Sequence, residues 1–326
     1  MIALLDRYRG PIESGLREAL RGETSLDGIL RYHVGLPDDG AEAPALGKLI
    51  RPSLVLFTAA QLGARIEDAL PAAIGLELVH GFSLLHDDVQ DGDEVRRGRP
   101  AAWVRWGTAE AINAGDLMHA IALRTALRAG AGVAGTLTAA VCDMIEGQSL
   151  DLAFEGRFVS EVDYGEMIDR KTGALFRCAF ELGGYCAGVP ETVLSALGQV
   201  GAEVGRAFQM QDDLLGIWGN GDEVGKPIGS DIRRKKKTYP VVIGHAASSG
   251  EARERLERIY ASEDVGVDDV DWIVALFERL GVRERVAVGV VEHSDRARGA
   301  IDRLPFSGDG KRELCELIEG LTRRKK

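Results

Sequence analysis

The stretch GLELVHGFSLLHDDVQDGDEVRRGRP, residues 75–100, indicates both the fold and the chemistry of this chain. Its apolar first half ends in five acids between Asp87 and Glu94, and arginines follow them. On a helix Asp87 and Asp91 share one face, about 5 to 6 Å apart at Cβ. Acids at a helix C-terminus oppose the helix dipole, so we expect a compensating cation. Mg²⁺ fits, because it takes carboxylate oxygens together with water or phosphate.

Composition is compatible with a large helical core. The chain has 326 residues, 45% of them hydrophobic and only 6% aromatic, which allows one large domain or two ordinary ones and favours helices. The net charge of −11 argues against a nucleic-acid partner. An anionic small substrate would need local basic patches. Candidates are the runs RRKKK (233–237) and RRKK (323–326), each of which could equally be a solvated face or a nuclear signal.

Cysteine usage and hydropathy predict a soluble protein of the reducing cytoplasm. The chain has four cysteines, Cys142, Cys178, Cys186 and Cys315. They form neither a CxxC pair nor a metal-ligand or disulfide pattern. The apolar start of residues 1–10 is too short and too charged for a signal peptide. The longest uncharged run, 129–142, is shorter than the roughly 20 apolar residues of a membrane span.

Apolar periodicity predicts helices along nearly the whole chain, with residues 66–91 apolar all round and therefore central. Gly and Arg make 92–107 a predicted loop, and 219–229 is the segment richest in Gly and Pro. No strand alternation or linker separates two parts. We therefore expect one all-α domain over residues 1–326. The expected helices cover about 3–21, 25–33, 48–62, 66–91, 109–128, 132–154, 161–171, 173–187, 191–217, 238–247, 250–260, 267–280, 282–302 and 310–322.

A motif that occurs twice in the chain predicts a second acidic face. FSLLHDDVQD (82–91) recurs in altered form as AFQMQDDLLG (207–216), so two facing helices could present acids to one cleft. Gly216 stands where the last acid of the motif would be repeated. The second cluster can therefore offer Asp212, with Asp213 turned about 100° away.

Two acidic clusters and separate basic clusters suggest a metal-bridged diphosphate, because metal and guanidinium together neutralise a leaving phosphate. A nucleotide-binding P-loop does not explain them. Gly225 and Lys226 are followed by Pro227 instead of the Ser or Thr that such a loop requires.

An ordered set of motifs resembles the trans-isoprenyl diphosphate synthases, the polyprenyl synthetase family. The motifs are GKLIRP (47–52), HGFSLLHDDVQDGDEVRRGRP (80–100), INAGD (112–116), GQSLD (147–151), KTGALF (171–176), GRAFQMQDDLLGIWG (205–219) and GKPIGSDIRRKKKTYP (225–240). The resemblance implies an isoprenoid-synthase helical bundle around a central cavity, three Mg²⁺ ions and a cytoplasmic homodimer. It also implies head-to-tail condensation of isopentenyl diphosphate with an allylic diphosphate (dimethylallyl, geranyl or farnesyl), followed by proton elimination.

The resemblance also implies a role for each matching residue. The metal ligands would be Asp87, Asp91 and Asp212. The carboxylates that support them would be Asp88, Asp213 and Asp231. Isopentenyl diphosphate would be bound by Lys48, Arg51, His80 and Arg97. The allylic diphosphate and the reacting centre would be contacted by Arg96, Lys171, Thr172, Gln209, Lys226 and Lys236.

Some positions depart from the family pattern. Leu49 stands where Arg or Lys is frequent, which removes one possible diphosphate contact. Lys235 replaces a common Gly, so the sequence leaves open whether Lys236 or Lys237 makes the clamp contact.

Product length depends, by the family rule, on the residue five positions before the first Asp. Phe82 occupies that position and Ser83 follows it, an arrangement that resembles one class of geranylgeranyl diphosphate synthases. An ideal helix places Phe82 about 140° from Asp87, so only the family rule supports this role. We predict a C20 product, with farnesyl or longer polyprenyl diphosphate as the alternative.

Two other classes of protein would share parts of this pattern. A terpene cyclase has the same fold and one DDxxD motif but needs only one diphosphate site, so Lys48, Arg51 and Arg97 would have no role. A non-catalytic subunit that modifies a partner synthase is the other alternative. Such subunits tend to lose the acids and the basic clamps, which this chain keeps.

Overall fold

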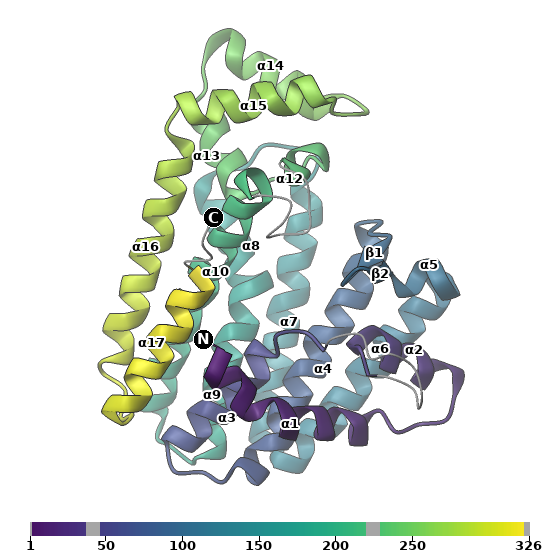
Figure 1. The fold of residues 1–326 in the computed structure, drawn as a ribbon, viewed down its shortest axis with the longest axis vertical. Coiled ribbons are helices and arrows are strands. Elements are labelled where there is room, and N and C mark those ends of the chain that lie inside the picture. Colours follow the sequence, from purple (N-terminus) through teal and green to yellow (C-terminus); the bar gives the residue numbers. More distant parts are fainter. Residues whose placement is uncertain (1, 37–45, 220–228, 323–326) are drawn as a thin grey trace. The chain divides into compact units, whose positions relative to one another are not determined.

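The computed structural model describes residues 2–36, 46–219 and 229–322, and most of them are helical (Figure 1). This confirms the predicted all-α class. The helices are α1 (Ile2–Ala19), α2 (Ser25–Val34), α3 (Ile50–Gln61), α4 (Ile66–Gln90), α5 (Ala102–Trp106), α6 (Thr108–Ala126), α7 (Ala131–Phe154), α8 (Glu161–Ile168), α9 (Ala174–Cys186), α10 (Glu191–Trp218), α12 (Ser230–Arg233), α13 (Tyr239–Ala247), α14 (Gly250–Ala261), α15 (Val267–Arg279), α16 (Val282–Ile301) and α17 (Gly308–Thr322).

Contacts within the chain define two compact units. The first comprises Met1–Val141, Arg177–Gly198 and Leu304–Glu313. The second comprises Cys142–Phe176, Gln199–Arg303 and Leu314–Lys326. The single domain over 1–326 stays a prediction.

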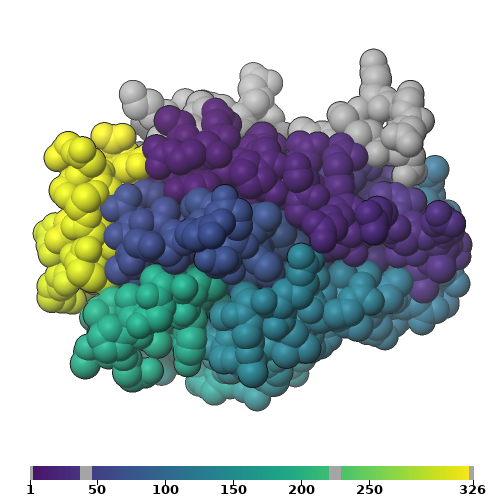
Figure 2. Space-filling model, turned by 90° about the horizontal axis from the view of Figure 1, so that it is seen from below, coloured from purple at the N-terminus to yellow at the C-terminus, as the bar shows by residue number. Residues whose placement is uncertain are grey.

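Helix α4 is the core of the first unit, where it packs against α6, α3 and α1. Figure 2 shows α1, in purple, lying along the indigo residues of α3. Gly75 permits a close crossing, because a Cβ there would lie 3.1 Å from the carbonyl oxygen of Ala122 on α6. By length and composition α4 could span a membrane, but 61% of its most apolar window is buried inside the protein. Burial of this kind is what a core helix shows.

A short hairpin corrects the predicted loop over 92–107. Strand β1 (Val95–Arg96) pairs antiparallel with β2 (Arg99–Pro100). The turn residues Arg97 and Gly98 have φ of 52° and 72°, as a tight two-residue hairpin turn requires. Tyr32 fastens the hairpin to α2, because its hydroxyl donates to the Pro100 carbonyl at 2.9 Å. Strands of two residues are too short to show the alternation by which a sequence predicts a strand.

The second unit has its own apolar core. The buried cluster joins α8, α10, α13, α15 and α16, with Phe277, Ile217 and Ile243 completely buried. Residues Asp169–Gly173 form a π-helical turn between α8 and α9, so the two predicted helices 161–171 and 173–187 are continuous. Gly205 on α10 lets this turn approach closely, since a Cβ there would lie 2.8 Å from the Gly173 Cα. The close approach brings the KTGALF motif beside the second acidic helix.

Candidate active site

The acid Asp87 lies on the last turn of α4, in the first unit, and Asp91 is the C-cap of this helix. Asp91 keeps helical backbone angles, and its N–H donates to the Asp87 carbonyl at 2.8 Å. Gly92 then ends the helix with a φ of 66°. The two side chains are half-buried and one turn apart, as the spacing predicts.

Asp88 points inward instead, and pairs with Arg96 on the hairpin. Its side chain is 1% exposed, and both Nε, at 2.8 Å, and Nη2 of Arg96 donate to its Oδ1. Burial raises the pKa of Asp88, while the Arg96 charge opposes this rise. Oδ2 of Asp88 is buried without a hydrogen-bond partner among the described residues. Asp88 thus fixes the predicted allylic clamp Arg96 next to the acidic turn.

The predicted isopentenyl diphosphate ligands Arg51, His80 and Arg97 gather in the same unit. Nη1 of Arg51 lies 3.4 Å from Nε2 of His80. Arg97 donates to the Val34 carbonyl at 3.1 Å and lies against Gly47, where a Cβ would be 2.9 Å from its Nη2. Burial, reinforced by the Arg51 charge, holds the pKa of His80 well below its usual value, so the ring is neutral at pH 7.

The predicted start of the next helix at Lys48 is two residues early. Leu49 has a φ of 54°, in the left-handed region, and α3 begins at Ile50. Lys48 is exposed in the turn that precedes the helix. It directly follows Gly47, against which the Arg97 guanidinium lies.

Glu77 is a buried acid that the sequence reasoning missed. It lies on α4, three residues before His80, and is 8% exposed. Burial raises the pKa of Glu77 to about 7, although Arg97 and Arg51 oppose the rise. The signal was present in the sequence as a single acid inside the apolar half of the opening stretch.

Phe82 packs against α6 and against His86 of its own helix. Its ring centroid lies 4.8 Å from that of His119 on α6 and 5.8 Å from that of His86. Ser83 donates its hydroxyl hydrogen to the His80 carbonyl at 2.9 Å. The sequence reasoning missed His119, which interrupts the apolar run LMHAIAL (117–123) of α6.

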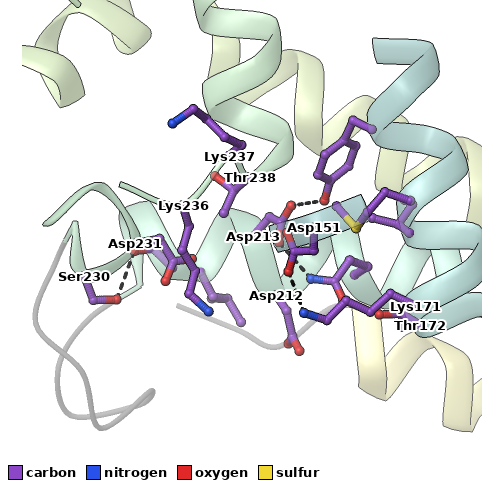
Figure 3. A pocket seen from close by; sticks show the side chains of 16 residues that line it. Asp151, Lys171, Thr172, Asp212, Asp213, Ser230, Asp231, Lys236, Lys237 and Thr238 are labelled. Atoms are coloured by element: carbon purple, nitrogen blue, oxygen red, sulfur yellow. Dashed lines mark hydrogen bonds and ion pairs between the residues drawn. The ribbon is translucent and has the colours of Figure 1, made fainter. Parts of the chain in front are cut away.

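A pocket of about 370 Å³ lies within the second unit (Figure 3). Its lining includes most of the remaining predicted residues: Lys171, Thr172, Gln209, Asp212, Asp213, Asp231 and Lys236. Lys171 donates to Asp151 at 2.5 Å. Asp151 is the last residue of the GQSLD motif, and the family resemblance assigned it no role.

Asp213 anchors a chain of hydrogen bonds at the wall of this pocket. It accepts hydrogen bonds from the Tyr164 hydroxyl, from the Gln209 amide at 2.9 Å and from the Tyr239 N–H at 2.8 Å. Thr172 donates in turn to Gln209 at 2.7 Å. Burial raises the pKa of Asp213 to about 7. Asp213 therefore orients Gln209 and Thr172, whereas Asp212 faces the pocket (Figure 3).

Gly216 leaves room for a carboxylate from another segment. A Cβ at Gly216 would lie only 1.9 Å from Oδ2 of Asp231 on α12. The second motif has no acid at position 216 of α10. The carboxylate of Asp231, which belongs to α12, occupies the space where that acid would lie.

The segment after α12 distinguishes the candidate clamp lysines. Lys235 has a φ of 53°, which explains why Gly is common at this position. Figure 3 shows Lys236 and Lys237 leaving the backbone in opposite directions. The Lys237 ammonium donates a hydrogen bond to the Glu155 carbonyl at 2.9 Å, so Lys236 is the better clamp candidate.

Lys226 and the tail 323–326 lie outside the described residues.

Residues 42–277 match the family model described as polyprenyl synthetase. The chain belongs to the polyprenyl synthetase family. This synthetase is 38% identical over 321 residues to the geranylgeranyl diphosphate synthase of Mycobacterium tuberculosis (strain ATCC 25618 / H37Rv), covering 93% of this chain and 88% of the relative. It is 36% identical over 306 residues to the (2E,6E)-farnesyl diphosphate synthase of Mycobacterium bovis, covering 91% and 85%.

A solved structure supports the same fold. The polyprenyl synthase from Caulobacter crescentus CB15, complexed with calcium and isoprenyl diphosphate, superposes with a TM-score of 0.88. It is 27% identical and covers 100% of this chain and 98% of its own. The predicted isoprenoid-synthase fold is confirmed, and the synthetase is a head-to-tail prenyltransferase.

The acidic side chains of this synthetase suit a metal that is shared with phosphate. Among the residues in the described part of the chain, no three His, Cys, Asp or Glu side chains group closely enough to hold a metal ion on their own. Mg²⁺ is usually held by one or two carboxylates, with waters and substrate phosphates completing its shell. Asp87 with Asp91 in the first unit, and Asp212 in the second, are donors of this kind.

Proposed function

We propose that this prenyltransferase condenses isopentenyl diphosphate with an allylic diphosphate in a Mg²⁺-dependent reaction and that geranylgeranyl diphosphate is its product. The observation that carries the proposal is the acidic turn of Asp87 and Asp91 beside the fixed guanidinium of Arg96. A carboxylate pair and an adjacent arginine suit a metal-bound diphosphate. The predicted homodimer and cytoplasmic location stay predictions.

The allylic side of the reaction needs cations around a departing diphosphate. Mg²⁺ ions, held by Asp87 and Asp91 in the first unit and by Asp212 in the second, would neutralise charge on phosphate oxygens. Arg96, Lys171 and Lys236 would add fixed positive charge. Charge that is in place before the C–O bond breaks stabilises the transition state more than the ground state. Apolar walls would protect the allylic cation from water.

The isopentenyl side needs a second anion site. Lys48, Arg51 and Arg97 would supply its charge, and the neutral His80 would bind by hydrogen bonding without adding charge. A terpene cyclase has no use for this second site. The cluster therefore favours condensation of two diphosphates over cyclisation of one.

The product assay tests the function directly. Purified protein is incubated with farnesyl diphosphate, labelled isopentenyl diphosphate and Mg²⁺, and the labelled products are separated by length. We expect a C20 product and none when EDTA replaces Mg²⁺. Release of diphosphate without consumption of isopentenyl diphosphate would indicate a cyclase. No Mg²⁺-dependent turnover with any allylic diphosphate would indicate a non-catalytic subunit.

A Phe82→Ala variant is expected to lengthen the product to C25 or beyond. Phe82 is 5% exposed and fills space against His119, so its removal opens a cavity next to α6. The measurement is the product length at a fixed substrate ratio. Leu85→Ala is the matched control, since Leu85 is buried on the same helix and its truncation creates a similar cavity. Unchanged products from Phe82→Ala, or equal lengthening in both variants, would contradict the role of Phe82.

A further inference from the structure

Lys237 is a buried lysine whose ammonium is enclosed by aromatic rings, all within the second unit. It is 7% exposed, and its Nζ lies 4.5 Å from the ring centroid of Tyr260 and 5.2 Å from that of Phe158. The same ammonium donates to the Glu155 carbonyl at 2.9 Å and to the Lys235 carbonyl at 3.3 Å. We call Phe158, Tyr260 and the Glu155 carbonyl the lysine cage. A cation between ring faces is attracted by both ring quadrupoles.

The walls of the lysine cage are themselves braced. Phe158 stacks on His245 with ring centroids 3.8 Å apart and an interplanar angle of 7°. His245 is held in turn by Glu257 at 2.8 Å. Tyr260 contributes its ring and not its hydroxyl, because the hydroxyl is buried without a hydrogen-bond partner among the described residues. Burial lowers the pKa of Lys237 to about 8, so the lysine is mostly charged at neutral pH.

The neighbouring Lys235 fastens the same segment at a second point. Its Nζ donates to the carbonyls of Ser262 and Glu263, the latter at 2.9 Å. Its positive φ of 53° turns the chain sharply just before Lys236. The Lys236 N–H donates to the Asp231 carbonyl at 2.9 Å, so the backbone of Lys236 is held from both sides.

The Lys236 side chain then has a defined direction. It lines the 370 Å³ pocket together with Asp212 and Lys171, while the Lys237 side chain leaves the backbone the other way (Figure 3). A long lysine side chain has many rotamers, and fixing its backbone removes part of the entropy that binding would otherwise have to overcome.

We propose that Lys237 is a positioning residue, which aims the Lys236 ammonium at the allylic diphosphate by locking the backbone of residues 235–237 to the lysine cage. This inference rests on the proposed function, in which Lys236 contacts that diphosphate. The three lysines of the RRKKK run then have different roles. Lys236 binds the substrate, and Lys235 and Lys237 hold the backbone of Lys236 in place.

The test compares Lys237→Met and Lys237→Arg, each alone and combined with Lys236→Ala. Binding of inorganic diphosphate in the presence of Mg²⁺ is measured by calorimetry, and KM is measured for farnesyl and for isopentenyl diphosphate. Lys237→Met removes the contacts with both rings and with the Glu155 and Lys235 carbonyls, and if about 1 kcal/mol of this loss reaches diphosphate binding, the effect is roughly fivefold. We expect Lys237→Met to weaken diphosphate binding and to raise the farnesyl diphosphate KM by that factor, with the isopentenyl diphosphate KM unchanged. Lys237→Arg keeps a cation in the cage and should recover most of the loss.

The Lys236→Ala background separates positioning from a general structural effect. If Lys237 acts through Lys236, Lys237→Met should cause no further loss there. An equal loss in both backgrounds, or no loss in either, would overturn the inference, as would a Lys236→Ala variant that binds diphosphate normally. Absence of prenyl transfer by the unaltered protein would overturn the proposed function instead, and the calorimetric comparison would still decide the role of Lys237.

Two variants of the cage wall complete the design. Tyr260→Phe keeps the ring and removes only the unpartnered hydroxyl, so diphosphate binding should not change. Tyr260→Leu removes the ring face and should weaken binding as Lys237→Met does. Thermal unfolding of each variant shows whether the fold persists. Equal behaviour of the two Tyr260 variants would exclude the ring as the reason for the effect.

Discussion

An Asp87→Asn variant is expected to lose on the order of 10³-fold in kcat/KM for prenyl transfer. Asp87 lies on the last turn of α4 and Asp91 is its C-cap, and both carboxylates are half-buried one turn apart, close to Arg96 on the hairpin. Asparagine keeps the shape of the side chain but removes its charge. The pair would then hold a divalent cation less tightly, so charge on the departing diphosphate would be less neutralised in the transition state.

The measurement is the initial rate with farnesyl and isopentenyl diphosphate over a range of Mg²⁺ concentrations. Glu94→Gln is the matched control, because Glu94 is an exposed acid just beyond the same turn and loses the same charge. We expect the control to behave like the unaltered protein. The affinity for Mg²⁺ in the presence of inorganic diphosphate is measured by calorimetry. It should fall in Asp87→Asn and stay unchanged in Glu94→Gln. Equal activity of the two variants would remove Asp87 from the metal site.

A Gly216→Asp variant is expected to lower kcat/KM by about 10²-fold, although it restores the acid that the second motif lacks. The new Cβ would lie 1.9 Å from Oδ2 of Asp231, so α12 or the Asp231 side chain must move. The introduced carboxylate would also repel that of Asp231. Because Lys236 follows Asp231 closely and is hydrogen-bonded to its carbonyl, the displacement would reach the allylic clamp.

Two further variants separate shape from charge at this contact. Gly216→Ala adds only a methyl group and should reduce activity less, through the steric conflict alone. The double variant Gly216→Asp with Asp231→Gly moves the acid from α12 to α10, and we expect it to recover part of the loss. Initial rates and thermal unfolding are measured for all three. Full activity of Gly216→Asp would show that Asp231 does not depend on the space at Gly216.

Local periodicity predicted much of the first acidic site. Burial of α4 follows from an apolar pattern that covers its whole circumference, and the shared face of Asp87 and Asp91 follows from their four-residue spacing. The family resemblance then predicted the partner residues, and the structure gathers them into one group in each unit. Lys226 alone lies outside the described residues.

The hairpin and the buried acids were harder to predict. Strands β1 and β2 are shorter than any alternation that a pattern could reveal, so the loop prediction over 92–107 missed them. The inward direction of Asp88 depends on Arg96 at the other end of a tight turn. The raised pKa of Glu77 could not be predicted either. It depends on the burial of Glu77 near Arg51 and Arg97, which are distant from it in sequence.

The sequence by itself determined the helical class, the family and the faces on which the acids lie, because these follow from the short repeat of a helix and from motif order. Only the tertiary structure decided where the individual charged side chains lie and what they contact. It placed Asp231 in the space that Gly216 leaves, it brought the Lys237 ammonium against Phe158 and Tyr260, and it placed Lys236 in the lining of the pocket. Such choices depend on which remote segments pack against a side chain, and no local period in the sequence records that packing.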